Sequence, residues 1–219
     1  MRVFSALFPP DEVVEDLSRA MTPWRRRFPD LDWTPPQLWH MRLSSFGNAS
    51  HADVSRLSRV LDVFAREHSP FEVRIDGAGA IPELTGGQTL YAKLETPDDA
   101  LLDLCLGAIA AVQNFGWVLD RRSFTPTFPL ARSAQPVDFT ELAQLVSEYQ
   151  SRIWEVTSFA TVWARPGSDG HQLFELLGEH ALLGQTPAPA GPRHRADPTA
   201  TPLRATEPRH AAAAFLPER

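Results

Sequence analysis

The fold of this chain depends most on the stretch Trp39-His40-Met41-Arg42-Leu43-Ser44-Ser45-Phe46-Gly47. Its apolar and polar side chains alternate, and a period of two predicts a half-buried β-strand. The side chains expected to face a core are those of Trp39, Met41 and Leu43. The side chains expected on the other face are those of His40, Arg42 and Ser44. An imidazole and a guanidinium are therefore expected on one face of one strand.

The patterns on either side of this strand predict further helices and strands. Helices are expected at 11–27, 50–68, 97–116 and 137–149, where apolar residues recur at helical spacing. Ser50 and Asp53 have the spacing of a capping box at the start of the second helix. Strands are expected at 2–8, 71–75, 89–94, 124–132, 154–164 and 171–183, with an irregular glycine-containing loop between 75 and 89. This order predicts an α+β fold with largely antiparallel sheets.

A second stretch, Phe124-Thr125-Pro126-Thr127-Phe128-Pro129-Leu130-Ala131-Arg132, repeats the character of the first at a distance of 87 residues, counted from His40 to Thr127. Together with Trp33-Thr34-Pro35-Pro36 and the opening residues 2–10, the two stretches carry a family resemblance. The chain resembles the 2H phosphoesterases, in particular the bacterial RNA 2′,3′-cyclic phosphodiesterases, also called 2′-5′ RNA ligases. The resemblance runs from residue 2 to about residue 184.

The motif of that family reads His-x-Thr/Ser-x and occurs once in each lobe. His40 matches the first histidine, but Arg42 stands where the hydroxyl residue is expected. In the second copy, Thr127 stands at the histidine position and Pro129 at the threonine position, whereas Arg132 matches the family pattern. The flanks of both motifs thus resemble the family, and most of the reactive side chains differ from it.

The resemblance implies a bilobal fold, with two antiparallel-sheet lobes and flanking helices around a central cleft. The family reaction opens a 2′,3′-cyclic phosphate with one histidine as base and the other as acid, and it needs neither a metal nor a cofactor. His40 is the expected catalytic residue, while Arg42, Thr127 and Arg132 are expected to bind phosphate or substrate. Because a hydroxyl does not titrate near neutral pH, Thr127 cannot replace an imidazole, and impaired catalysis is expected.

Three functions are compatible with these residues. The first is a catalytically impaired relative that binds a phosphate-bearing nucleotide or an RNA 2′,3′-cyclic phosphate end in the cleft. The second is a slow cyclic phosphodiesterase in which His171 or His51 replaces the missing histidine, while His180 is expected at the surface. The third is a protein-interaction module, which the acidic body, the six Trp and the proline-rich C-terminal segment favour.

Composition and charge narrow the class of partner. The net charge is −6, and residues 1–184 hold 16 basic and 24 acidic side chains once the five Arg and three acidic residues from Gln185 onward are removed. An acidic surface repels phosphodiester backbones, so no long nucleic-acid footprint is expected beyond a local site. Residues 1–184 are expected to form one bilobal domain. Residues 185–219, with seven prolines and no apolar periodicity, are expected to be a disordered tail whose partner the sequence does not identify.

Two further features concern location and redox chemistry. No apolar run approaches the roughly 20 residues of a membrane span, and the N-terminus lacks a signal-peptide pattern, so a cytoplasmic protein without a membrane partner is expected. The single cysteine, Cys105, lies among apolar residues of a predicted helix. A buried thiol that behaves as a small hydrophobic group is expected there, because a nucleophilic cysteine needs an exposed, electropositive setting.

Overall fold

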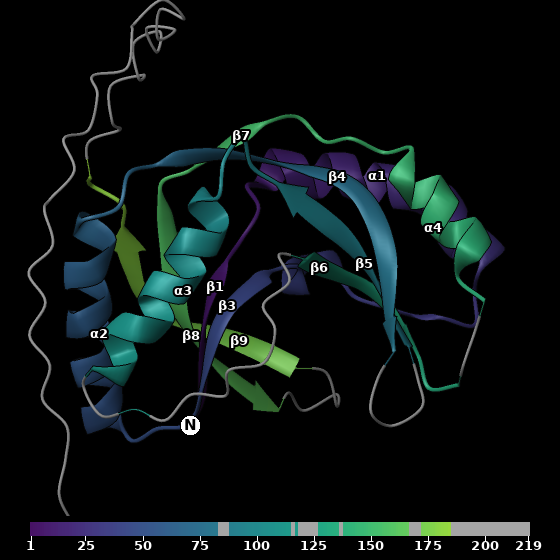
Figure 1. Ribbon diagram of the computed structural model, residues 1–219. Helices are drawn as coiled ribbons and strands as arrows, with labels where there is room; N and C mark the ends of the chain where they lie inside the picture. The colour runs from purple at the N-terminus through teal and green to yellow at the C-terminus, as the bar shows by residue number, and fades with distance from the viewer. Residues whose placement is uncertain (83–87, 115–116, 118–126, 136–137, 167–171, 185–219) are drawn as a thin grey trace, which may run out of the picture. The chain divides into compact units, whose positions relative to one another are not determined.

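Two antiparallel sheets form the framework of the computed structural model, which describes residues 1–82, 88–114, 117, 127–135, 138–166 and 172–184 (Figure 1). The four-stranded sheet has the order β3-β1-β8-β9, with bounds Met41–Asn48, Arg2–Leu7, Ser158–Pro166 and Gln172–Ala181. The five-stranded sheet has the order β2-β6-β5-β4-β7, with bounds Asp32–Trp33, Thr127–Ser133, Gln88–Glu95, Phe71–Pro82 and Trp154–Val156. All paired strands are antiparallel, so the α+β fold class with antiparallel sheets is confirmed.

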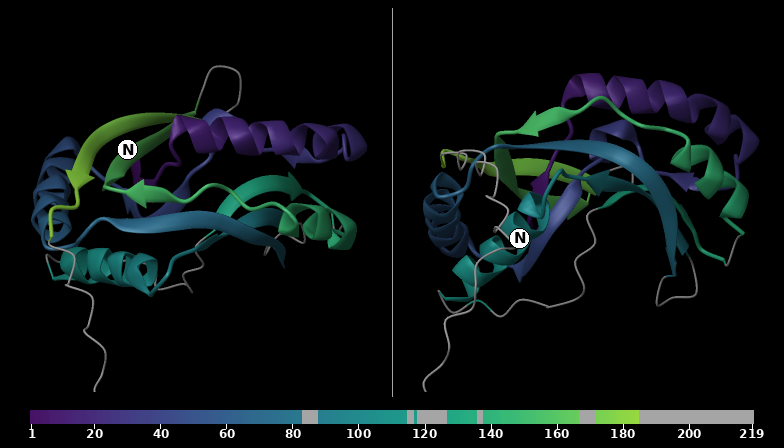
Figure 2. Two further views of the ribbon diagram at one scale, coloured as in Figure 1. Left: turned by 90° about the horizontal axis from the view of Figure 1, so that it is seen from above. Right: turned by 45° about the horizontal axis from the view of Figure 1, so that its top comes forward.

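Helices flank each sheet. Helices α2 (His51–Arg66) and α3 (Ala100–Gln113) lie side by side and pack against β9 and β3 of the four-stranded sheet. Helix α4 (Thr140–Ser147) packs against β4 and β5. The last residue of α1 (Asp11–Arg27), Arg27, forms an ion pair with Glu141 in the first turn of α4, which lies near one end of α1 (Figure 2). Two sheets flanked by helices match the bilobal architecture that the resemblance implies.

Local sequence explains the two long helices. Helix α1 begins and ends at the predicted residues, with acidic side chains in its first turn and arginines in its last, which suits the helix dipole. Helix α2 begins at the predicted capping box: the Asp53 backbone N–H donates to the Ser50 side chain at 3.2 Å, and the Asp53 carboxylate accepts from the Ser50 backbone N–H at 3.0 Å. A cap of this kind stabilises a helix by about 1 kcal/mol.

The four-stranded sheet has two chemically different faces. One face of β1 carries Val3 and Leu7 into the main hydrophobic core, where they lie with buried side chains of α2 and α3. The opposite face carries a smaller apolar cluster made of Phe4, Ala6, Ala160, Val162 and Ala164, with Phe174 packed against it. That second face is the one that bounds the site described below.

A register shift in β3 corrects the prediction for Ser44. The expected alternation placed Ser44 on the face of His40 and Arg42, but Ser44 is only 6% exposed and pairs with Ser5. Arg42 pairs with Ala6 and Ser44 with Ser5, so Leu43 is an extra residue between two consecutive partners on β1. Such a β-bulge moves the side chains that follow it to the other face, here up to a second register shift between Ser45 and Gly47. A sequence period of two does not reveal it.

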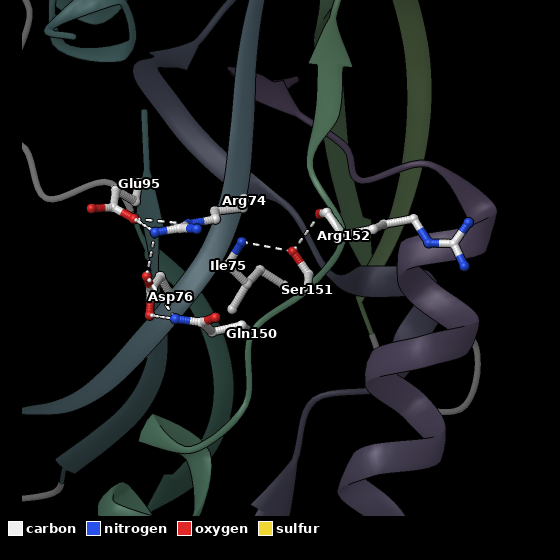
Figure 3. Close-up of polar contacts among 7 residues, drawn as sticks. All are labelled: Arg74, Ile75, Asp76, Glu95, Gln150, Ser151 and Arg152. Carbon is white, nitrogen blue, oxygen red and sulfur yellow. Dashed lines mark hydrogen bonds and ion pairs between the residues drawn. The ribbon is translucent and has the colours of Figure 1, made fainter. Parts of the chain in front are cut away.

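The segment predicted as one strand at 154–164 is two strands in different sheets. Trp154–Val156 pairs with β4 of the five-stranded sheet, whereas Ser158–Pro166 pairs with β1 and β9 of the four-stranded sheet. The residues before this crossing are fixed to β4, because the Ile75 backbone N–H donates to the Ser151 hydroxyl at 2.8 Å (Figure 3). The Ser151 backbone N–H also donates to the Ile75 carbonyl, at 3.1 Å. The chain thus passes from one sheet to the other at Thr157.

Other boundaries also differ from the prediction. Strand β4 continues to Pro82 through the expected glycine loop, with Gly77 at φ +85° beside a register shift between Ile75 and Ala78. Glycine tolerates this left-handed conformation at low cost, which lets the strand continue through the bulge. The short strand β2 and the 3₁₀ turn at Pro36–Leu38 were not expected. Helices α3 and α4 are shorter than predicted at both ends.

Some expectations fall outside the described residues. The predicted disordered tail at 185–219 and the interaction hypothesis that depends on it both lie there, as do residues 124–126 of the second motif and His171. The described residues belong to one compact unit that ends at residue 186. Among them, no helix is both long and apolar enough to cross a membrane.

Candidate functional site

All four side chains predicted to form a site line one cavity of about 930 Å³. His40 immediately precedes β3 and Arg42 is the second residue of that strand, whereas Thr127 and Arg132 belong to β6. The other residues that line it are Arg2, Asp32, Thr34, Pro35, Leu38, Pro129, Trp163, Ala164, Arg165, Pro166 and Phe174. The structure therefore brings the two motif strands, which belong to different sheets, to a single cavity.

His40 is held by aromatic rings and by one backbone hydrogen bond. Its ring centroid lies 5.1 Å from that of Phe4, 5.9 Å from that of Phe8 and 4.8 Å from that of Phe174. Its Nδ1 lies 2.7 Å from the Leu38 carbonyl oxygen. Because a carbonyl only accepts hydrogen bonds, Nδ1 carries the proton, and the unprotonated nitrogen of the neutral ring is Nε2.

The surroundings of His40 disfavour its charged form. The side chain is only 7% exposed, and burial is the main cause that lowers its pKa from 6.5 to about 4, with a further lowering by the nearby Arg42 cation. The hydrogen bond to Leu38 opposes these effects only in part. At neutral pH about one imidazole in a thousand is therefore protonated. His40 is a neutral hydrogen-bond acceptor and a weak base under these conditions.

Arg42 places a cation on the wall of the cavity. Its guanidinium carbon lies 4.6 Å from the centroid of the Phe4 ring, a distance typical of a cation–π contact. The pKa of Arg42 is lowered by partial enclosure and by repulsion from Arg2 and Arg132. Arg2 and Arg132 line the same cavity as Arg42, so three guanidinium groups share one space. An anion placed among them would relieve that repulsion.

Strand β6 supplies the opposite wall. Thr127 and Pro129 alternate with the buried Phe128, so both line the cavity. Tyr91 on β5 pairs with Pro129 while its neighbour Leu90 pairs with Ala131, which makes Leu130 an extra residue. The bulge places the Arg132 side chain on the same face as Thr127, so both line the cavity. Pro129, next to the extra residue, is tolerated in the strand because fewer backbone hydrogen bonds form between the strands at a bulge.

Several lining residues were missed in the sequence. Arg2 and Phe174 come from β1 and β9, and no motif position singled them out. Asp32 is the only carboxylate among the described lining residues. It lies opposite Arg132 in the strand pairing of β2 with β6. Arg165 is at the rim, with an ion pair of 3.8 Å to Glu175. Long-range strand pairing places these residues, and a single sequence gives no signal for such pairing.

Neither described histidine that was considered beside His40 lies in the cavity. His51 is exposed at the N-terminus of α2, so it does not replace the missing histidine. His180 was expected at the surface, but it is only 1% exposed. Its Nδ1–H donates to the Asp62 carboxylate at 2.7 Å, and its Nε2 accepts from the Thr161 hydroxyl at 2.8 Å. Since Thr161 is fully buried, this Thr-His-Asp arrangement joins α2 to β8 and β9 and is closed to substrate.

Comparison with known proteins identifies relatives over most of the chain. No protein-family model matches it. It is 28% identical over 196 residues to an RNA 2′,3′-cyclic phosphodiesterase of Thermus thermophilus, which covers 82% of this chain and 92% of the relative. It is 23% identical over 151 residues to an RNA 2′,3′-cyclic phosphodiesterase of Methanothermobacter thermautotrophicus, which covers 69% of this chain and 81% of that protein.

Solved structures agree with these relatives. The crystal structure of a Thermus thermophilus protein superimposes with a TM-score of 0.69 at 26% identity and covers 85% of this chain and 100% of that one. The crystal structure of E. coli LigT complexed with 3′-AMP gives a TM-score of 0.66 at 19% identity and covers 83% of this chain and 97% of LigT. With the two-sheet fold and the paired motif strands, these similarities show that the chain belongs to the 2H phosphoesterase superfamily.

Proposed function

We propose that this protein binds a phosphate-bearing nucleotide or RNA end in the cavity between its two motif strands and that its cyclic phosphodiesterase activity is impaired. The observation that carries the proposal is the composition of the cavity. Among the described lining residues there is one imidazole, His40, and it lies close to a cluster of arginines. The site therefore has several groups that can bind an anion and few that can transfer a proton.

The catalytic half of the proposal depends on acid–base chemistry. Hydrolysis of a cyclic phosphate needs one group that takes a proton and another that gives one, both near neutral pH. Thr127 occupies the second motif position, and its hydroxyl does not titrate in that range. His40, with a pKa of about 4, is almost never protonated at neutral pH and so cannot serve as the acid. Loss of one general acid or base lowers a rate by roughly 10² to 10⁴.

The binding half of the proposal depends on charge. Four arginines and one aspartate line the cavity, whereas acidic residues outnumber basic ones in the chain as a whole. Guanidinium groups bind phosphate through paired, charge-assisted hydrogen bonds. Positive charge gathered in one cavity of an acidic protein attracts a small anion without attracting a long polyanion. Two relatives named RNA 2′,3′-cyclic phosphodiesterase, and the LigT structure with 3′-AMP, support a nucleotide as the phosphate carrier.

Isothermal titration calorimetry with adenosine mononucleotides tests the binding half. We expect dissociation constants in the micromolar range, roughly 10⁻⁶ to 10⁻⁴ M, and a loss of about tenfold in Arg42→Gln, because one charge-assisted hydrogen bond to phosphate contributes about 1.5–3 kcal/mol. Arg66→Gln is the matched control, since Arg66 is an exposed arginine of α2 that does not line the cavity. Absence of binding at millimolar ligand, or equal losses in both variants, would contradict the proposal.

A slow cyclic phosphodiesterase is the second candidate, and Asp32 is the observation that favours it. This carboxylate lines the same cavity as His40 and could act as the missing proton-transfer group. Hydrolysis of adenosine 2′,3′-cyclic monophosphate, followed by chromatography of the products, separates the two candidates. Turnover that disappears in both Asp32→Asn and His40→Phe would establish the second candidate. Turnover that persists in both variants would come from a contaminant or another site.

A further inference from the structure

We infer that the cavity selects an open phosphate monoester with a free neighbouring ribose hydroxyl over the 2′,3′-cyclic phosphodiester. This inference rests on the proposed function and names the ligand class for the same site. An adenosine 3′-monophosphate, or an RNA end that carries the same group, has this chemistry. The inference follows from two observations, the number of guanidinium groups that converge on Arg42 and the protonation of the His40 ring.

The first observation concerns the charge of the ligand. Arg2, Arg42 and Arg132 line the same cavity, and Arg2 and Arg132 both lie close enough to Arg42 to repel its charge. In the described part of the chain neither Arg2 nor Arg42 forms an ion pair with a carboxylate. A cyclic phosphodiester carries one negative charge, whereas a phosphate monoester carries about 1.5 to 2 at neutral pH and has three free oxygens in place of two. The monoester therefore relieves more of the repulsion and accepts more hydrogen bonds from the arginines.

The preference for a monoester over a cyclic phosphodiester arises from the altered first motif, which contains Arg42. In the family pattern a neutral hydroxyl residue stands at this position, so the substitution adds a full positive charge beside the phosphate site. The contact with Phe4 and the pairing of Arg42 with Ala6 hold that charge on the cavity face of β3. A cation fixed there interacts more strongly with a dianion than with a monoanion in proportion to ligand charge.

The second observation concerns hydrogen-bond donors on the ligand. The Nδ1–H of His40 is used by the Leu38 carbonyl, so Nε2 remains as an acceptor with no proton of its own. In a 2′,3′-cyclic phosphate both ribose oxygens are esterified, and neither can donate to that nitrogen. In a 3′-monophosphate the 2′-hydroxyl is free and can donate. A neutral imidazole kept as an acceptor thus favours the open form.

The two groups stand at a spacing that one ligand can satisfy. His40 and Arg42 are two residues apart with their side chains on the same side of the chain, and both line the cavity. Side chains at this spacing are about 7 Å apart at their Cα atoms and converge on adjacent groups of one ligand. A phosphate and the hydroxyl on the neighbouring ribose carbon are such adjacent groups. One open nucleotide can therefore contact the imidazole and the guanidinium together.

Calorimetric titration with three matched ligands tests the inference. The ligands are adenosine 3′-monophosphate, adenosine 2′,3′-cyclic monophosphate and 2′-deoxyadenosine 3′-monophosphate, each at a pH of about 7.5, where the monoester is mostly dianionic. We expect the first to bind about tenfold more tightly than the cyclic form and about fivefold more tightly than the deoxy form. Equal or tighter binding of the cyclic form, or equal binding of the ribose and deoxyribose forms, would overturn the inference while leaving the proposed anion site intact.

Two variants separate the two contributions. Arg42→Gln should reduce the preference for the monoester over the cyclic form while it keeps most of the preference for ribose over deoxyribose. His40→Phe, which preserves the aromatic packing, should abolish the preference for ribose over deoxyribose. It should keep most of the preference for the monoester over the cyclic form. Thermal unfolding of each variant checks that it is folded. Failure of all three ligands to bind the wild-type protein would reject the proposed function itself, whereas preferences unchanged in the folded variants would reject only the inference.

Discussion

The guanidinium of Arg42 lies over the ring of Phe4, with its central carbon 4.6 Å from the ring centroid. Phe4 also contacts the imidazole of His40, at 5.1 Å between ring centroids. One aromatic ring of β1 therefore contacts both candidate site residues of the first motif. The arrangement makes Phe4 a positioning residue, because it touches the groups that would contact a ligand.

Replacement of Phe4 by leucine should weaken ligand binding through loss of these contacts. A partly exposed cation–π contact contributes about 0.5–1 kcal/mol, so the dissociation constant for adenosine 3′-monophosphate should rise about two- to fivefold in calorimetry. Phe8→Leu is the control, because Phe8 is partly exposed and contacts His40 but has no described contact with Arg42. A larger loss of affinity in Phe8→Leu than in Phe4→Leu would show that the stack on Arg42 does not matter.

Protonation of His40 should destabilise the fold as the pH falls. Its pKa is lowered from 6.5 to about 4 in the native state, so between these values the unfolded chain binds more protons than the folded one. The free energy of unfolding should therefore decrease as the pH falls through this window, by about 3 kcal/mol over its whole width. Urea unfolding at several pH values gives the free energy of unfolding of the wild type and of His40→Phe. If this free energy changes with pH to the same extent in both proteins, the lowered pKa of His40 is refuted.

Loss of the Thr161 hydroxyl should cost stability without changing ligand affinity. Thr161→Val would leave the buried Nε2 of His180 without its donor, and an unsatisfied buried acceptor costs about 1–3 kcal/mol. Urea unfolding should show this decrease, whereas Thr22→Val, an exposed position on α1, should change stability by less than about 0.5 kcal/mol. A change in nucleotide affinity in Thr161→Val would mean that the buried network reaches the cavity.

Restoration of the family motif should restore hydrolysis. The triple variant Arg42→Thr, Thr127→His and Pro129→Thr supplies a second imidazole and removes the cation that helps to lower the pKa of His40. The rate of adenosine 2′,3′-cyclic monophosphate hydrolysis should rise by roughly 10² to 10⁴ over the wild type. Addition of His40→Phe to the same variant is the control and should remove the gain. No gain in a folded triple variant would show that features outside the two motifs also limit catalysis.

The thiol of Cys105 should be unreactive in the folded protein. It is fully buried in α3, it donates to the Leu43 carbonyl at 3.0 Å, and burial raises its pKa to about 12. The thiolate is the reactive form of cysteine. A chromogenic disulfide reagent, which releases a coloured product when it reacts with a thiol, should therefore show no fast reaction with the native protein at a pH of about 8. One equivalent should react after the protein is unfolded in urea. Rapid reaction of the native protein would contradict this account.

Local patterns in the sequence predicted the elements that local forces determine. Helix α1 begins at Asp11 and ends at Arg27 as expected, because its apolar spacing and terminal charges act within the helix itself. The capping box of Ser50 and Asp53 was also predicted, since both partners lie within one turn. The fold class followed from the order of such elements. These features need no knowledge of distant parts of the chain.

Features that depend on pairing between distant strands were not predictable from one sequence. The bulges at Leu43 and Leu130, and the division of residues 154–164 between two sheets, arise from partners far away in the sequence. The same limit applies to the cavity. His40 and Thr127 stood out because motifs marked them, whereas Asp32 lines the cavity only because β2 pairs with the end of β6. Tertiary contacts decide such positions.

The extra residue in β6 makes the ligand chemistry depend on chain length as well as on side-chain identity. Thr127 and Arg132 are five residues apart, and a regular strand would turn side chains at an odd separation to opposite faces. The bulge at Leu130 compensates for this separation, so deletion of Leu130 would remove the bulge and leave Arg132 opposite Thr89, still on the face of Thr127. Insertion of one further residue into a strand that keeps the bulge would instead turn Arg132 towards the hydrophobic interior. In proteins of this architecture, the number of residues between the motif and the arginine is therefore as informative as their identity.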